Sequence, residues 1–229
     1  MKKLMLVASM AALLATSAFG QSKQGNLEDV LNLLDKTSAG FKSVQTDFVW
    51  DQYEKVVNEH DIQKGVMYFR RATNKVEMAA DIREPAPKSV LFTGEELQVY
   101  QPKIDQVTVY EAGKNREDFE AYLVLGFGGR GHDLPKNFDV SYKGMENVDG
   151  KATYKLELAP KSPKVKNMFS LITLWIDPQT GMSVQQEFKE SGGDYRQAKY
   201  TSILINRPLP ADAFKLKTTA KTKRIRPNS

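Results

Sequence analysis

The sequence predicts an α+β protein built on a single, strongly curled antiparallel sheet, a half-open β-barrel of about ten strands covered by short helices. Three observations support this prediction. An amphipathic helical segment lies near the N-terminus, segments that alternate between polar and apolar residues follow it, and turn-forming residues separate those segments. A large sheet twists and curls, and a few short helices cover its apolar face incompletely. A curled sheet with a helical lid is suited to holding an apolar ligand.

The segment before Gln21 has the features of a secretory signal peptide. Two lysines precede the short apolar run Leu4–Ala15, and Ala18 and Gly20 provide small residues before a signal-peptidase cleavage site. We therefore expect residues 1–20 to be removed and the mature chain to be exported. A membrane anchor is the alternative, but this apolar run is shorter than the roughly 20 residues that a bilayer span needs.

Composition restricts the mature chain further. The length of 229 residues suggests one domain, here residues 21–217, and the sequence contains no cysteine. Without cysteine the chain can form no disulfide, and it cannot itself carry the lipid of a lipoprotein. The formal net charge is +5, and the basic residues of the segment 215–229 have no acidic residue among them. We predict that residues 218–229 form a basic, disordered tail, which either contacts anionic lipid or an acidic partner or acts only as a solubilising end.

Two segments have helical periodicity. The first covers residues 26–41, where Asn26 is suited to cap the helix and Gly40 to end it. The second covers residues 115–125 and is followed by the glycine-rich run Gly126–Gly131. We interpret this run as a flexible connection rather than a phosphate loop, because no Lys-Ser/Thr pair follows it. The apolar stripe of the first helix consists of Leu27, Val30, Leu31 and Leu34.

The remaining segments alternate as β-strands do. Phe48 and Trp50 share one face of the first strand, whereas Asp47 and Asp51 point the other way. Turn dipeptides such as Asp149-Gly150 separate the strands, and no internal repeat or interdomain linker interrupts them. The predicted strands cover residues 44–57, 65–71, 75–83, 88–93, 96–101, 104–111, 137–143, 151–158, 168–176, 182–190, 194–205 and 213–217.

Large apolar side chains gather on the predicted inward face of the sheet. Core packing explains any one of them, and the lining of a lipid-binding cavity is the alternative. Methionine and aromatic side chains suit such a cavity because they adapt to flexible chains. The candidate cavity residues are Phe48, Trp50, Met67, Phe69, Met78, Val90, Phe92, Leu97, Val99, Met168, Phe169 and Trp175.

Arg71 is the exceptional residue of this face. By alternation it lies on the same side of its strand as Met67 and Phe69. A charged group that faces an apolar interior is costly unless hydrogen bonds satisfy it. One interpretation ends the strand at Arg70 and leaves Arg71 in solvent. The other makes Arg71 a switch that holds a lid closed through hydrogen bonds to backbone carbonyls.

The sequence contains no pattern of residues typical of catalysis or metal binding. His60 and His132, the two histidines, have no partner at ligand spacing, and we interpret both as solvated loop residues. No nucleophile, base and orienting group occur in a recognisable motif. The aromatic residues alternate with acidic rather than basic ones, which argues against nucleic-acid binding. We expect a non-enzymatic protein without a metal or cofactor.

Several short motifs follow one another in order between residues 41 and 217, and each is weak alone. Their order and spacing resemble the outer-membrane lipoprotein carrier proteins, the LolA family. The motifs are Phe41–Phe48, Gly65-x-Met67-x-Phe69-x-Arg71, Glu84-Pro85, Thr93–Pro102 with Gln106-Val107-Thr108, Tyr154–Lys161, Leu174–Gly181, and Ile205-Asn206-x-Pro208-Leu209 with Phe214.

The resemblance implies a monomeric, periplasmic half-barrel with an apolar cavity. That cavity would take the acyl chains of lipoproteins from an inner-membrane lipoprotein-releasing transporter and pass them to an outer-membrane acceptor. Arg71 falls on the family's lid-holding arginine, although Ala72 stands where the family usually has proline. The alternative is a periplasmic sensor module on the same fold, which binds a lipid or lipoprotein without transferring it.

Overall fold

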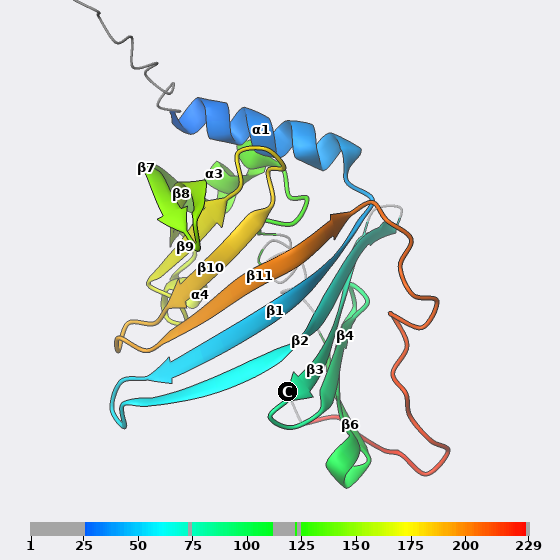
Figure 1. The fold of residues 1–229 in the computed structure, drawn as a ribbon. Helices are drawn as coiled ribbons and strands as arrows, with labels where there is room; N and C mark the ends of the chain where they lie inside the picture. Colours follow the sequence, from blue (N-terminus) through cyan, green and yellow to red (C-terminus); the bar gives the residue numbers. More distant parts are fainter. Residues whose placement is uncertain (1–25, 73–74, 112–121, 123–124, 228–229) are drawn as a thin grey trace, which may run out of the picture.

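The computed structural model describes residues 26–72, 75–111, 122 and 125–227, and twelve strands within these residues form one sheet (Figure 1). Its order is β12-β6-β5-β4-β3-β2-β1-β11-β10-β9-β8-β7. Neighbouring strands are antiparallel, except that β12 runs parallel to β6. The strands are β1 (Ser43–Glu54), β2 (Glu59–Ala72), β3 (Lys75–Glu84), β4 (Lys88–Phe92), β5 (Glu96–Gln101), β6 (Gln106–Glu111), β7 (Phe138–Val148), β8 (Lys151–Pro160), β9 (Leu171–Ile176), β10 (Ser183–Lys189), β11 (Tyr195–Ile205) and β12 (Lys223–Ile225).

The sheet curls but does not close. Its two edges are β7 and β12, at opposite ends of the strand order. Figure 1 shows the strands around β8 and β9 rotated strongly against those around β3 and β4. The predicted curled sheet with helices is confirmed, with twelve strands in place of about ten. One parallel pair makes it a mixed sheet.

The centre of the sheet joins segments from opposite ends of the chain. β1 pairs with β2 on one side and with β11 on the other. In this register Val44 lies opposite both Phe69 and Ile205, so alternating residues of three strands share one apolar face. The long central strands therefore form one continuous inner surface.

Helix α1 (Leu27–Gly40) crosses above one end of the sheet (Figure 1). Its first turn is held by a capping box, in which Asn26 and Asp29 each accept a hydrogen bond from the other's backbone N–H. The shorter helical segments are η1 (Pro102–Ile104), η3 (Gly131–Asp133), α3 (Leu134–Asn137) and α4 (Pro163–Lys166). The predicted signal peptide and the predicted helix 115–125 lie outside the described residues, except for Tyr122 and Leu125.

The apolar interior consists of two main clusters. The first lies on the inner face of β1 to β4 and β11, and the second lies where α1 packs on β7, β8 and β9. Val30 and Leu34 bring the apolar stripe of α1 into the second cluster, as its spacing predicts. The fully or nearly buried strand residues of that cluster are Phe138, Leu156, Leu158, Ile172, Leu174 and Ile176.

The C-terminal segment differs from its prediction. Residues 213–217 form no strand, and residues 223–225 pair with β6 instead of belonging to a disordered tail. Arg226 is held at this edge by ion pairs with Glu96 (2.9 Å) and Glu111 (3.2 Å). The sequence of the tail contains no acidic partner for its basic charges. The acidic partners of Arg226 lie more than a hundred positions earlier in the chain, so the local sequence did not indicate them.

Replacing Leu34 with alanine tests the packing of α1. Leu34 is 5% exposed, so we expect Leu34→Ala to lower the free energy of unfolding by about 2–5 kcal/mol through lost burial and a residual cavity. Leu204→Ala is the matched control, because Leu204 is 45% exposed and its loss should change stability by no more than about 0.5 kcal/mol. Urea denaturation measures both. Equal effects of the two substitutions would contradict the packing role of α1.

Candidate functional site

The inner face of the sheet brings most of the predicted cavity residues together. They belong to the first cluster, which also includes Val44, Ala80, Ile82 and Tyr200. Tyr200 brings a phenol into the cluster, and its hydroxyl donates to Oε1 of Gln186 (3.1 Å). Burial raises the pKa of Tyr200 far above its ordinary value, so the phenol stays neutral. The predicted cavity residues found here are Phe48, Trp50, Met67, Phe69, Met78, Val90, Phe92 and Leu97.

The structure places the other four predicted residues differently. Val99 lies opposite Val90 in the β4–β5 register, and is therefore on the same row of the sheet as the first cluster. Met168 is 51% exposed in the loop after α4, and Phe169 packs at the margin of the second cluster. Trp175 lies between the inward-facing Leu174 and Ile176 and therefore points to the opposite face.

The prediction that Trp175 faces inward failed for a physical reason. β9 has the sequence Leu-Ile-Thr-Leu-Trp-Ile, and it is buried on both faces over most of its length. Such a strand has no clear alternation of polar and apolar residues, so the sequence alone does not show which face is inward. On the outer face, the Lys155 ammonium group lies 5.2 Å from the Trp175 ring.

A residue that the sequence analysis missed completes the apolar interior. Phe127 comes from the glycine loop, Gly126–Gly131, and its side chain is only 1% exposed. Its ring stacks on Phe69 with centroids 4.8 Å apart and meets Tyr200 edge-on at 4.7 Å. The interpretation of this run as a flexible connection is therefore wrong, because the loop packs into the first cluster.

The glycines allow the loop to approach the interior this closely. Gly128 has a φ of +79°, and a Cβ atom there would lie 2.5 Å from the Phe41 ring. At Gly131 a Cβ atom would lie 2.2 Å from the carbonyl oxygen of Leu31 in α1. The loop is thus pressed between α1 and the inner face of the sheet, and side chains at these positions would push it out.

Arg71 fastens the loop and α1 to β2. Its guanidinium donates to the carbonyl oxygen of Ser38 (3.0 Å), to the Ser38 hydroxyl (3.2 Å) and to the carbonyl oxygen of Gly128 (2.7 Å). It also lies 5.7 Å from the centre of the Phe41 ring. Ser38 is in the last turn of α1, and its carbonyl oxygen also accepts from the Phe41 N–H (3.2 Å). Of the two interpretations of Arg71, the structure agrees with the one in which it binds backbone carbonyls.

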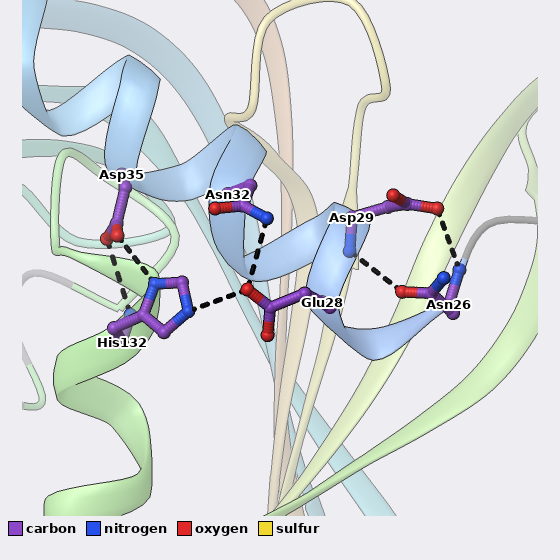
Figure 2. Close-up of polar contacts among 6 residues, drawn as sticks. All are labelled: Asn26, Glu28, Asp29, Asn32, Asp35 and His132. Carbon is purple, nitrogen blue, oxygen red and sulfur yellow. Dashed lines mark hydrogen bonds and ion pairs between the residues drawn. The ribbon is translucent and has the colours of Figure 1, made fainter.

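His132 fastens the other end of the loop to α1 (Figure 2). Its Nδ1 lies 2.6 Å from Oδ2 of Asp35, and its Nε2 lies 3.1 Å from Oε1 of Glu28. Its backbone N–H also donates to Asp35, at 3.3 Å. Glu28 accepts a further hydrogen bond from Asn32 (3.1 Å) on the same helix. His132 is therefore not a merely solvated loop residue.

The protonation of His132 matters for this contact. Only a doubly protonated imidazolium can donate from both ring nitrogens at once. Hydrogen bonds to Asp35 and then to Glu28 raise the pKa of His132 above its ordinary value. Desolvation acts to raise the pKa of Asp35, but the hydrogen bonds from His132 outweigh it and hold that pKa below its usual range. The neighbouring Asp133 pairs with Lys136 at 2.8 Å.

The described part of the chain offers little for other chemistry. Within it, no group of three histidine or acidic side chains is placed to hold a metal ion. Also within it, no helix is long and apolar enough to span a membrane. What the site contains is an apolar interior, a loop that inserts into it, and polar contacts that hold this loop, among them those of Arg71 and His132.

The family model described as "Outer membrane lipoprotein carrier protein LolA" matches residues 39–217, which is well over half of the chain. The chain belongs to the LolA family. The carrier proteins of the LolA family are non-enzymatic binding proteins of the periplasm. The matched range includes Arg71, the glycine loop and every predicted cavity residue.

Relatives and solved structures agree with this LolA-family fold. The outer-membrane lipoprotein carrier protein of Dechloromonas aromatica (strain RCB) is 30% identical over 140 residues, which span 59% of this chain and 59% of that protein. An uncharacterized conserved protein from Thermus thermophilus has a TM-score of 0.55 at 10% identity, covering 87% of this chain and 98% of its own. MucB has a TM-score of 0.53 at 16% identity, covering 83% and 62% respectively. At these identities the two structures show the fold alone.

The contacts of His132 predict a dependence of stability on pH. Because its pKa is raised in the folded protein, the stabilisation is complete below about pH 6.5, the ordinary value, and is lost as pH rises through the raised pKa. We expect the melting temperature to fall between about pH 6 and pH 9, and to fall less in His132→Gln, whose side chain does not titrate. Thermal denaturation at several pH values measures this difference.

His60→Gln is the control for that experiment. His60 bonds to Asp51 across the β1–β2 hairpin (2.8 Å), far in sequence from the glycine loop. We expect the difference in pH dependence between the wild type and His132→Gln to stay the same when both proteins also carry His60→Gln. A His132→Gln variant that follows the wild-type curve would show that the imidazolium contact does not stabilise the fold.

Proposed function

We propose that this protein is a periplasmic carrier that encloses the acyl chains of lipoproteins and moves them from the inner to the outer membrane. Membership of the LolA family supports a lipoprotein-binding role. The observation that carries the proposal is an apolar interior beside which Arg71 donates hydrogen bonds to the carbonyl oxygens of Ser38 and Gly128. The proposal takes this contact as the one that closes the interior and opens on loading. The apolar residues of the first cluster are the proposed binding surface for the acyl chains.

The free energy of acyl-chain exposure explains why a carrier is needed. Each buried methylene contributes roughly 0.8 kcal/mol, so exposing a chain of about 16 carbons to water costs on the order of 12 kcal/mol. Hydrogen bonds to a charged group contribute roughly 1.5–3 kcal/mol each. One acyl chain that enters the interior therefore supplies enough free energy to break the three hydrogen bonds of Arg71.

The partners belong to the proposal as well. Loading would take place at an inner-membrane lipoprotein-releasing transporter, and unloading at an outer-membrane acceptor. The monomer would act alone between them, after removal of residues 1–20. N-terminal sequencing of the exported protein would test the cleavage before Gln21.

Native mass spectrometry tests the carrier function directly. The mature protein is mixed with a purified triacylated lipoprotein in a detergent that can be removed from the complex. We expect a one-to-one soluble complex that is lost when the acyl groups are cleaved, and we expect the lipoprotein to move on to acceptor membranes. Stable capture without transfer would favour a sensor module instead. Absence of any complex would contradict both functions.

Arg71→Leu tests the closing contact. The substitution removes three hydrogen bonds that favour the closed, empty form, and it leaves the strand pairing of β2 in place. We expect an intact fold, shown by circular dichroism, and release of bound lipoprotein to acceptor membranes slowed by about tenfold or more. Release can be followed by recovery of the lipoprotein in the membrane fraction.

The preceding arginine provides the matched control. Arg70 is on the other face of β2, where it forms an ion pair with Glu77 and lies 4.1 Å from the centre of the Phe214 ring. Arg70→Leu removes the same charge without touching α1 or the glycine loop, so release should keep the wild-type rate. Normal release from Arg71→Leu would contradict its role in closing the interior.

A further inference from the structure

Phe127 occupies the part of the interior in which the proposed function places an acyl chain. Its ring lies against Phe69 and Tyr200, and both belong to the cluster that includes the predicted cavity residues. Most residues of that cluster are on strands and form its walls, whereas Phe127 enters from the glycine loop. It is therefore a side chain that the fold inserts into the interior from outside the sheet.

The contacts of Phe127 suit a group that leaves and returns. Its side chain is held by apolar ring contacts alone, since phenylalanine has no polar atom. The backbone beside it is fastened at Gly126, whose carbonyl accepts from the Ser183 N–H (2.9 Å), and at Gly128, whose carbonyl accepts from Arg71 (2.7 Å). The second fastening is the one that Arg71 can release, and glycine on each side allows the backbone to turn.

We propose that Phe127 is an internal plug that competes with the acyl chain for the same space and thereby sets the affinity for lipid. This inference rests on the proposed function and adds a residue that decides which chains are held. When a chain enters, the Phe127 ring moves out of the first cluster and the methylenes take over its contacts with Phe69 and Tyr200. When the chain leaves, the ring returns, so the empty carrier never exposes a hollow apolar surface to water.

The exchange favours long chains. Burial of a phenylalanine side chain is worth about as much as burial of two to four methylenes. An acyl chain must therefore bury more than about two to four methylenes before its displacement of Phe127 lowers the free energy. Long acyl chains exceed this threshold easily, whereas short amphiphiles do not. The plug thus lowers the affinity for every lipid and excludes the smallest ones.

The affinity for cis-parinaric acid, a long-chain fluorescent fatty acid, tests the competition. We expect Phe127→Ala to bind this probe about tenfold more tightly than the wild type, because the competing group is gone. Phe92→Ala is the matched control: Phe92 is equally buried in the same cluster but is part of the wall on β4. Its loss should weaken binding, because Phe92 belongs to the proposed binding surface. If both variants bound the probe equally more tightly than the wild type, the cause would be the added cavity volume, and the proposal would be overturned. An unchanged affinity of Phe127→Ala would also overturn it.

Thiol labelling observes the movement itself, since the natural chain has no cysteine. In Phe127→Cys, the single thiol should react slowly in the empty protein and faster once cis-parinaric acid is added. In Phe92→Cys, the probe should leave labelling unchanged or slow it, because the wall stays in place. A Phe127→Cys rate that the probe leaves unchanged or lowers would overturn the plug.

These outcomes are separable from those of the carrier function. If the probe assays behave as expected but lipoprotein is not transferred to membranes, the plug stands and the carrier function fails. If lipoprotein is carried but the probe neither binds more tightly to Phe127→Ala nor accelerates its labelling in Phe127→Cys, the plug fails alone. Failure of every variant to bind the fatty acid would also overturn the plug.

Discussion

The attachment of α1 and the glycine loop to β2 depends on the hydrogen bonds of the Arg71 guanidinium. Arg71 reaches from β2 to the last turn of α1 at Ser38 and to the glycine loop at Gly128. Its acceptors are two backbone carbonyls and the Ser38 hydroxyl. A carboxylate in their place would form a stronger, bidentate pair. A further contact of the loop depends on the protonation of His132, whose pKa is raised by the hydrogen bonds to Asp35 and Glu28. The attachment of the loop at His132 therefore changes with pH.

Much of the fold could be predicted because local patterns determine it. The stripe of apolar residues in α1 and the alternation along β1 and β2 assign each side chain to a face before any long-range contact is known. The same alternation places Arg71 beside Met67 and Phe69, and the register of β2 with β3 confirms that it lies on this row, opposite Val76. A charged residue on an apolar row requires partners, which is why its hydrogen bonds to backbone carbonyls could be anticipated.

What could not be predicted depends on distant partners or on strands without alternation. The predicted face of Trp175 was wrong because β9 is buried on both sides. The C-terminal strand β12 was missed because the acidic partners of Arg226 come from β5 and β6. Phe127 was overlooked because a glycine-rich sequence indicates freedom of the backbone, and only the packed structure shows that the glycines are there to permit close contact.

The pairing of β1 with β11 also affects how the chain can acquire its fold. Thr46 and Thr201, which are hydrogen-bonded across this pair, are 155 residues apart in sequence. Pairing between such distant segments is slow, because the intervening loop must close before the contact brings any gain. A chain that is exported from its N-terminus, as proposed here, cannot complete the centre of its sheet until β11 has also emerged. This topology would therefore delay folding during synthesis. Under the proposed export, the delay would keep the chain unfolded while it passes through a translocation channel.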